Sequence, residues 1–124
     1  MLRVAVIGLG IGKVHLREYK QNLKTQIAAV VDMLPNLAQE VAAQYEARAF
    51  TSIEEMLRNV TIDAASICTP PAIHAEQVEQ LARVGVHVLV EKPMAPSLAD
   101  CQRMIQAARQ AGVKLMIGQK KRFY

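Results

Sequence analysis

Hydrophobic residues along this chain gather in short runs that are separated by segments with helical spacing. The first run, residues 2–7, contains Val4, Val6 and Ile7, and β-branched residues of this kind favour a strand. Runs of the same type follow at 26–31, 47–50, 63–68, 86–90 and 113–117. Because these runs are mostly apolar throughout instead of alternating, they predict strands covered on both faces, as in a parallel sheet.

Between the runs, apolar positions recur every three or four residues, which predicts helices. Ser52 and Glu55 are spaced as a capping box, while Ser97 and Gly112 are suited to begin and end another helix. Six strands that alternate with helices, joined by right-handed crossovers, predict a single α/β domain. Its expected architecture is a Rossmann-type, doubly wound parallel sheet in three layers, with the strand order 3-2-1-4-5-6.

The composition narrows the function classes. The 124 residues are 52% hydrophobic, which is enough for one domain with a buried core. No run reaches the roughly 18 apolar residues of a membrane span, and the N-terminus lacks a signal-peptide pattern, so we expect a cytoplasmic protein without a membrane partner. The net charge is +4, but the basic residues are scattered and only three tyrosines and two phenylalanines are present. Nucleic-acid binding is therefore not expected.

The cysteines and histidines do not have the spacing of metal ligands, and no metal is expected. Cys68 and Cys101 are interpreted as buried thiols that form no disulfide. His15 is expected to pack beneath the turn that follows the first strand. His87, within the fifth apolar run, is expected to be a core residue.

The first strand leads directly into a glycine-rich turn and then into a helical pattern. This order is typical of a phosphate site, because glycines let the backbone approach an anion and a helix N-terminus offers unpaired N–H groups. The spacing is unusual, since Gly12 precedes the usual position of a third glycine, which Lys13 occupies. The residues expected to contact a dinucleotide here are Gly8, Leu9, Gly10, Ile11 and Gly12.

Other unusual residues fall at the carboxyl ends of the predicted strands, where ligands of such sheets bind. Asp32 lies about 20 residues beyond Gly10, near the spacing of the acidic residue that binds ribose hydroxyls. A helix cap or a solvated loop carboxylate is the alternative role. A carboxylate would repel a 2′-phosphate, so NAD is favoured over NADP. The further candidates for cofactor contact are Thr69, Pro70, His74, Glu91, Lys92 and Gln119.

Lys92 is the catalytic candidate, because it ends an apolar strand and faces the expected ligand crevice. There its amino group could exchange a proton with a substrate hydroxyl or carbonyl as a hydride moves. A surface lysine after a strand is the alternative. Glu91 is expected to point to the other side and to hold the loop geometry. For His74, a position lining the cofactor and a purely structural position both stay open.

Taken together, these residues resemble the N-terminal domain of the glucose–fructose oxidoreductase / inositol dehydrogenase (Gfo/Idh/MocA) family. The resemblance covers the whole chain, and its specific part is the pairing of Thr-Pro-Pro-Ala-Ile-His at 69–74 with Glu-Lys-Pro at 91–93. It implies an NAD(P)-dependent oxidoreductase acting on a sugar, cyclitol or related polyol, with Lys92 assisting proton transfer and 69–70 along the cofactor. It also makes the Lys92-Pro93 peptide bond a candidate for the cis form.

The resemblance further implies a division of the protein into domains. Residues 1–118 are expected to be the cofactor domain, and 119–124 the start of the crossing to a substrate domain that this chain lacks. The chain alone is then expected to be inactive, and a homo-oligomer could replace the contact surface that the missing domain would cover. A non-catalytic NAD(P)-sensing protein of the same fold is the alternative, although a sensor has no need of Lys92.

Overall fold

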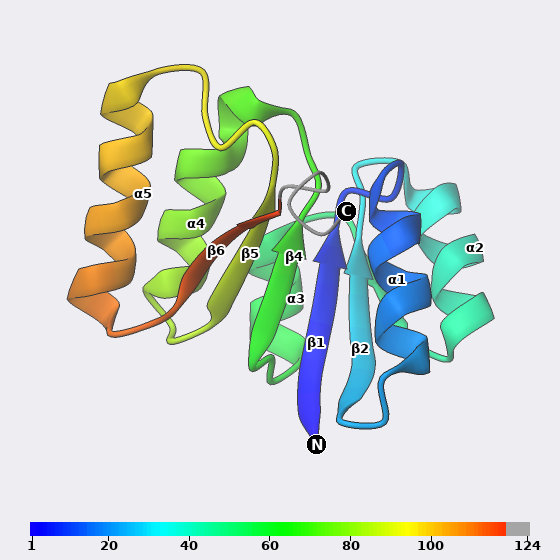
Figure 1. Cartoon of the computed structure of the whole chain (residues 1–124). Helices are drawn as coiled ribbons and strands as arrows, with labels where there is room; N and C mark the ends of the chain where they lie inside the picture. The colour runs from blue at the N-terminus through cyan, green and yellow to red at the C-terminus, as the bar shows by residue number, and fades with distance from the viewer. Residues whose placement is uncertain (119–124) are drawn as a thin grey trace.

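The computed structural model describes residues 1–118, which form a six-stranded parallel sheet with helices on both faces (Figure 1). The strands lie in the order β3-β2-β1-β4-β5-β6, as predicted. They are β1 (Leu2–Ile7), β2 (Thr25–Val31), β3 (Arg48–Phe50), β4 (Ala64–Ile67), β5 (His87–Glu91) and β6 (Leu115–Gly118). The helices are α1 (Gly12–Gln21), α2 (Pro35–Tyr45), α3 (Ile53–Asn59), the 3₁₀ helix η1 (Pro71–Ile73), α4 (His74–Ala82) and α5 (Leu98–Ala111).

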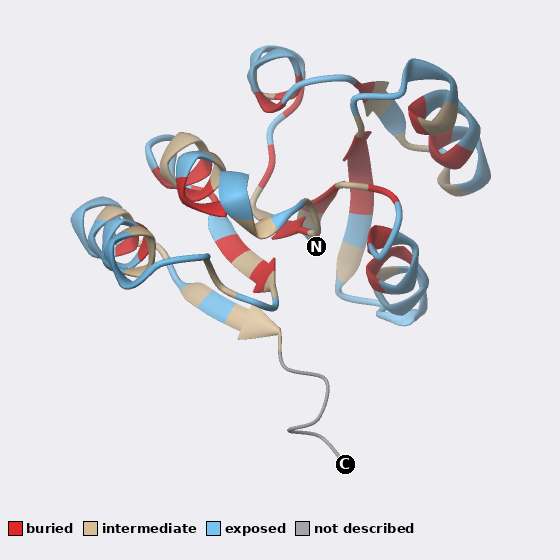
Figure 2. Cartoon of the chain, turned by 90° about the horizontal axis from the view of Figure 1, so that it is seen from above, coloured by how far each residue is buried: buried red, intermediate tan, exposed pale blue. Residues whose placement is uncertain are grey.

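Alternate side chains of β1 belong to two hydrophobic layers, one on each face of the sheet. Val4 and Val6 pack with Leu16 in the layer beneath α1 and α2. Ile7 packs with Met104 in the layer beneath α3, α4 and α5. Figure 2 shows the buried residues of the helices turned toward the sheet between them. This double burial explains why the first run is apolar at consecutive positions.

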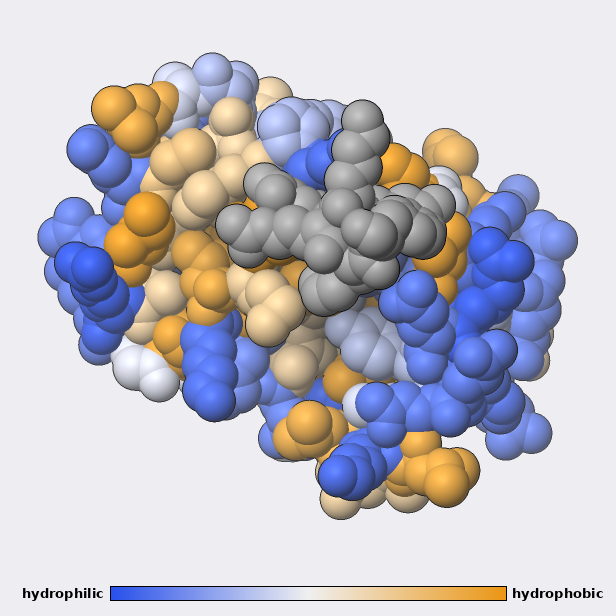
Figure 3. Space-filling model, in the orientation of Figure 1, coloured by the Kyte–Doolittle hydropathy of each residue, from blue (hydrophilic) through white to orange (hydrophobic). Residues whose placement is uncertain are grey.

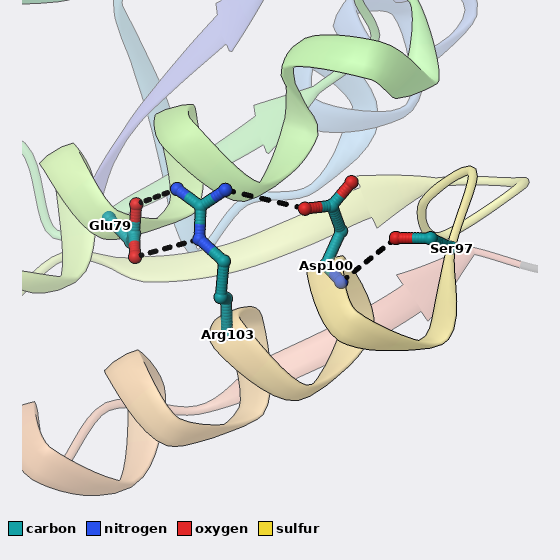
Figure 4. A network of polar contacts seen from close by, with 4 residues as sticks. All are labelled: Glu79, Ser97, Asp100 and Arg103. Carbon is teal, nitrogen blue, oxygen red and sulfur yellow. Dashed lines mark hydrogen bonds and ion pairs between the residues drawn. The ribbon is translucent and has the colours of Figure 1, made fainter.

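Side-chain caps begin two of the helices as predicted. The Ser52 hydroxyl accepts a hydrogen bond from the backbone N–H of Glu55 at the start of α3, at 3.1 Å. Ser97 does the same for α5, and Gly112 ends that helix with a φ of +69°. Arg103 then joins α5 to α4 through its ion pair with Glu79 (Figure 4). None of the helices within residues 1–118 has the length and hydropathy required to span a membrane.

The expected burial of three residues was wrong. His87 is exposed at the start of β5, where its Nδ1 accepts a hydrogen bond from the backbone N–H of Lys114. Val88 faces the α3–α5 layer, so His87 faces the side on which α1 and α2 lie over β1 and β2 and leave β5 uncovered (Figure 1). Cys68 and Cys101 are half-buried free thiols, one directly after the end of β4 and the other in the first turn of α5.

The uncovered part of the sheet is visible at the surface. Figure 3 shows the molecule in the orientation of Figure 1. Hydrophobic residues gather on its left, where β5 and β6 lie, whereas the surface over α1 and α2 on its right is mostly hydrophilic. Met116, in the edge strand β6, is 64% exposed. The helical cover of the two faces is therefore unequal.

Candidate functional site

The carboxyl ends of the parallel strands meet along one edge of the sheet, at the top of Figure 1. The glycine segment, defined here as residues 8–12, follows β1, and Asp32 follows β2. Thr69 and Pro70 follow β4, and Lys92 follows β5. The fold therefore brings segments that are distant in sequence to one edge, as predicted. Gln119, the remaining candidate, lies outside the described residues.

At two of the three glycine positions, neighbouring atoms leave no room for a side chain. Gly8 has a φ of +89°, and a Cβ atom there would lie 2.8 Å from the backbone carbonyl of Cys68. Gly12 begins α1, and a Cβ there would lie 2.7 Å from Cγ1 of Val6. Gly12 thus permits the close packing of helix on strand that is the usual role of the third glycine, despite the shorter spacing. A Cβ at Gly10 would meet no atom within 4 Å.

The N-terminus of α1 can receive an anion. Among the residues that the structure describes, the backbone N–H groups of Gly10, Ile11 and Gly12 donate no hydrogen bond to another residue. Ile11 is 58% exposed, so this turn opens to the surface. Free N–H groups and the positive end of the helix dipole suit a phosphate, and this arrangement fits the pyrophosphate of a dinucleotide.

Asp32 fastens the glycine segment to the start of α2. Its Oδ2 accepts a hydrogen bond from the backbone N–H of Leu9 at 2.9 Å, and its Oδ1 accepts one from Leu34 at 3.0 Å. The N-cap residue of α2 is Leu34, so Asp32 does not occupy the cap position itself. Each carboxylate oxygen keeps a lone pair for a further donor, such as a ribose hydroxyl.

His74 holds together the segments that follow β4 and β5. Its imidazole is fully buried, with Nε2 2.6 Å from the carbonyl oxygen of Thr69 and Nδ1 3.0 Å from that of Met94. The Thr69 hydroxyl in turn donates to Oε1 of Gln77 at 2.5 Å. Because both ring nitrogens face backbone carbonyls, this geometry favours a structural position for His74 over direct cofactor contact.

Lys92 is exposed beyond the end of β5, and its peptide bond to Pro93 is cis, as the resemblance implied. Its backbone N–H donates to Oε2 of Glu91 at 3.1 Å, while Oε1 of Glu91 lies 2.9 Å from Nε2 of His15. Glu91 thereby holds the turn that carries Lys92, in agreement with its expected role.

Two polar residues of this region were not foreseen. Ser66 is fully buried within β4, and its hydroxyl oxygen lies 3.0 Å from Nδ1 of His15 and 2.6 Å from the hydroxyl of Tyr19. Burial, more than any neighbouring charge, raises the pKa of Tyr19. The signal in the sequence was a serine inside an apolar strand, because a buried hydroxyl requires a hydrogen-bond partner.

Cys68 lies between the glycine segment and Glu91. Its Sγ is 3.8 Å from the position of a Cβ at Gly12. Burial, with a smaller contribution from the Glu91 carboxylate, raises the pKa of this thiol to about 12. Cys68 is therefore a packed thiol and not an activated nucleophile. Within residues 1–118, no cluster of three or more histidine, cysteine or acidic residues is placed to hold a metal ion.

Residues 2–119 match the Gfo/Idh/MocA group, described as an oxidoreductase family with an NAD-binding Rossmann fold. The chain is 35% identical to a 4-carboxy-2-hydroxymuconate-6-semialdehyde dehydrogenase of Sphingobium, covering 98% of this chain and 39% of that protein. It is 36% identical to a UDP-N-acetylglucosamine 3-dehydrogenase of Acidithiobacillus ferrooxidans, covering 99% and 38%. It is 34% identical to an inositol 2-dehydrogenase of Rhizobium meliloti, covering 98% and 37%. The chain thus spans less than two fifths of these relatives.

Solved structures of dehydrogenases contain a domain with the same fold. The WlbA dehydrogenase of Bordetella pertussis, in complex with NADH and UDP-GlcNAcA, superposes with a TM-score of 0.93 at 33% identity, covering 98% of this chain and 38% of that one. A myo-inositol dehydrogenase structure from Sinorhizobium meliloti gives a TM-score of 0.91 at 31% identity, covering 99% and 37%.

Proposed function

Because this chain belongs to the Gfo/Idh/MocA oxidoreductase family, with its NAD-binding Rossmann fold, we propose that it is the cofactor-binding part of a dehydrogenase. The cofactor is NAD, bound along the carboxyl edge of the sheet. The substrate carries a hydroxyl or keto group on a sugar, cyclitol or related polyol. The names of the UDP-N-acetylglucosamine and inositol dehydrogenases among its relatives support this substrate class.

The hydrogen bond from the Leu9 N–H to Asp32 is the observation that carries the proposal. It joins the Asp32 carboxylate to the glycine segment, and this supports binding of the ribose hydroxyls at Asp32 next to a pyrophosphate at the start of α1. The same carboxylate would repel a 2′-phosphate, and the adjacent Met33 offers no positive charge to attract one. This arrangement favours NAD over NADP.

Lys92 is the proposed catalytic residue. When bound, NAD would supply the acceptor or donor of a hydride. The exposed amino group of Lys92 lies on the turn after β5, from which it would hydrogen-bond the reacting oxygen of the substrate and give or take its proton. Glu91 and His74 hold the backbone on either side of this turn. We further propose that the substrate pocket belongs to the longer part of the relatives that this chain does not match, so the chain alone is inactive.

The cofactor site is tested by titrating the chain with NADH and following the fluorescence of the bound nicotinamide. Asp32→Asn removes the negative charge, and we expect NADH affinity to fall about tenfold, the effect of one lost charged hydrogen bond. Asp63→Asn is the matched control, because Asp63 also accepts a backbone N–H, from Arg3 at 2.8 Å, but at the opposite edge of the sheet. Absence of NADH binding at millimolar concentration, or equal losses in both variants, would contradict the proposal.

The preference for NAD is tested by the double substitution Asp32→Ser with Met33→Arg. Removal of the repelling carboxylate and introduction of a guanidinium should shift the ratio of NADPH to NADH affinity toward NADPH by at least tenfold. An unchanged ratio would show that Asp32 does not lie beside the adenosine ribose.

A further inference from the structure

Beneath the glycine segment, four side chains from α1, β4 and β5 form a continuous series of polar contacts, the polar relay, which consists of Tyr19, Ser66, His15 and Glu91. We propose that His15, acting through Glu91, is a positioning residue that fixes the Lys92 turn relative to the glycine segment. It thereby determines how the nicotinamide half of the cofactor is held. This inference rests on the proposed function, namely that the chain binds NAD.

The donors of the polar relay can all point in one direction. Because Glu91 carries a carboxylate, Nε2 of His15 donates to its Oε1, at 2.9 Å. The Nδ1 atom of a neutral imidazole then accepts a hydrogen bond from the Ser66 hydroxyl, at 3.0 Å, and Ser66 accepts one from Tyr19, at 2.6 Å. A neutral His15 thus satisfies every member, and no buried side-chain nitrogen or oxygen of the described residues lacks a partner.

The polar relay ends on the backbone of the proposed catalytic residue. The second carboxylate oxygen of Glu91, Oε2, accepts the backbone N–H of Lys92 at 3.1 Å. One carboxylate therefore joins the imidazole of α1 to the turn that carries Lys92. His15 lies three residues after Gly12, in the same helix whose first turn faces the pyrophosphate position.

The link crosses the sheet from α1 to the end of β5. The strand β4 lies between β1 and β5, and α1 lies over β1 and β2, so Glu91 is reached across β4. The side chains of His15 and Glu91 are 10% and 22% exposed, so solvent screens their contact far less than a surface pair. Shielded contacts of this kind hold geometry, because their loss leaves a buried polar atom without a partner.

The test compares two ligands that share the same adenosine half. We expect His15→Phe and Glu91→Ala to weaken NADH binding about tenfold, but to change the affinity for ADP-ribose, which lacks nicotinamide, less than twofold. Isothermal titration measures both ligands, and circular dichroism confirms that each variant is folded. Should His15→Phe fail to fold, Glu91→Ala carries the same comparison. His87→Gln is the matched control, because His87 lies exposed at the other end of β5.

A conservative variant separates hydrogen bonding from loss of packing. In Glu91→Gln the amide oxygen can accept the Lys92 N–H while the amide nitrogen donates to His15, whose other nitrogen then donates to Ser66. We therefore expect the NADH affinity of Glu91→Gln to stay within threefold of that of the unaltered chain. Equal losses for NADH and ADP-ribose in His15→Phe and Glu91→Ala, or no loss for either ligand, would overturn the inference alone. Failure of the unaltered chain to bind either ligand would overturn the proposed function itself.

Discussion

The glycine segment and the Lys92 turn lie at the same edge of the sheet, but different forces hold them. Apart from the hydrogen bond between Leu9 and Asp32, the glycine segment depends on the absence of side chains, since a Cβ at Gly8 or Gly12 would come within 2.8 Å of Cys68 or Val6. The Lys92 turn depends on hydrogen bonds from side chains elsewhere, because Glu91 meets a histidine 76 residues away. The first segment is therefore sensitive to added volume, and the second to the loss of distant polar partners.

The largest effect is expected from Gly8→Ala. A positive φ costs an L-residue about 1–2 kcal/mol, and the clash of the new Cβ with the Cys68 carbonyl adds a similar amount. The free energy of unfolding should therefore fall by about 3 kcal/mol, measured by urea denaturation. Gly10→Ala is the control, since its Cβ would meet nothing within 4 Å and should change stability by less than about 0.5 kcal/mol. Similar losses in the two variants would remove the steric half of the comparison.

An intermediate effect is expected from His74→Leu, which tests the second segment. Leucine fills a similar volume but cannot donate the hydrogen bond that the imidazole N–H gives to the backbone carbonyl of Thr69 or of Met94. A buried carbonyl without its donor costs about 1–3 kcal/mol, so we expect the free energy of unfolding, measured by urea denaturation, to fall by about 2 kcal/mol. The control His87→Gln replaces an exposed imidazole and should lower the free energy of unfolding far less. A stable His74→Leu protein would show that packing alone holds the Lys92 turn.

The third prediction changes no residue and concerns the rate of chemical labelling of Cys68, which lies near both the glycine segment and Glu91 of the Lys92 turn. With a pKa of about 12, its reactive thiolate is rare at pH 8, and iodoacetamide should label Cys68 at least about a hundredfold more slowly in the folded than in the urea-unfolded chain. Peptide mass spectrometry distinguishes Cys68 from Cys101. Fast labelling of Cys68 in the folded chain would show that the two segments do not close over it.

The same raised pKa has a consequence for stability. The folded thiol stays protonated while the unfolded thiol loses its proton above about pH 9, so the unfolded state binds fewer protons in this range. The free energy of unfolding should therefore decline as the pH rises from 9 toward 12. Cys68→Ser should make this decline shallower, and an unchanged slope would contradict the shift. Tyr19, whose pKa is also raised, acts in the same direction at somewhat higher pH. Burial is the main cause of its shift and remains in Cys68→Ser, which removes only the smaller contribution of Cys68.

Local patterns in the sequence predicted most of the fold. Apolar runs identified all six strands, with boundaries within two residues of those observed, and Ser52 and Ser97 marked two helix starts. The shortest of the predicted strands, at 47–50, is present as β3. These predictions succeed because strand burial and helix capping are decided by a residue and its near neighbours. His87 failed because its exposure depends on whether a helix from another part of the chain covers β5.

By itself, the sequence determined the elements, their order in the sheet, and the presence of Asp32, Lys92 and the glycines at one edge. Hydrophobic periodicity and crossover handedness suffice for this. Only the tertiary structure decided that Gly12 packs against β1, that His74 faces two backbone carbonyls, and that His15 reaches Glu91 across β4. These roles depend on atoms brought within about 3 Å of one another from remote parts of the chain, and hydrogen bonds and steric contacts act only at that range.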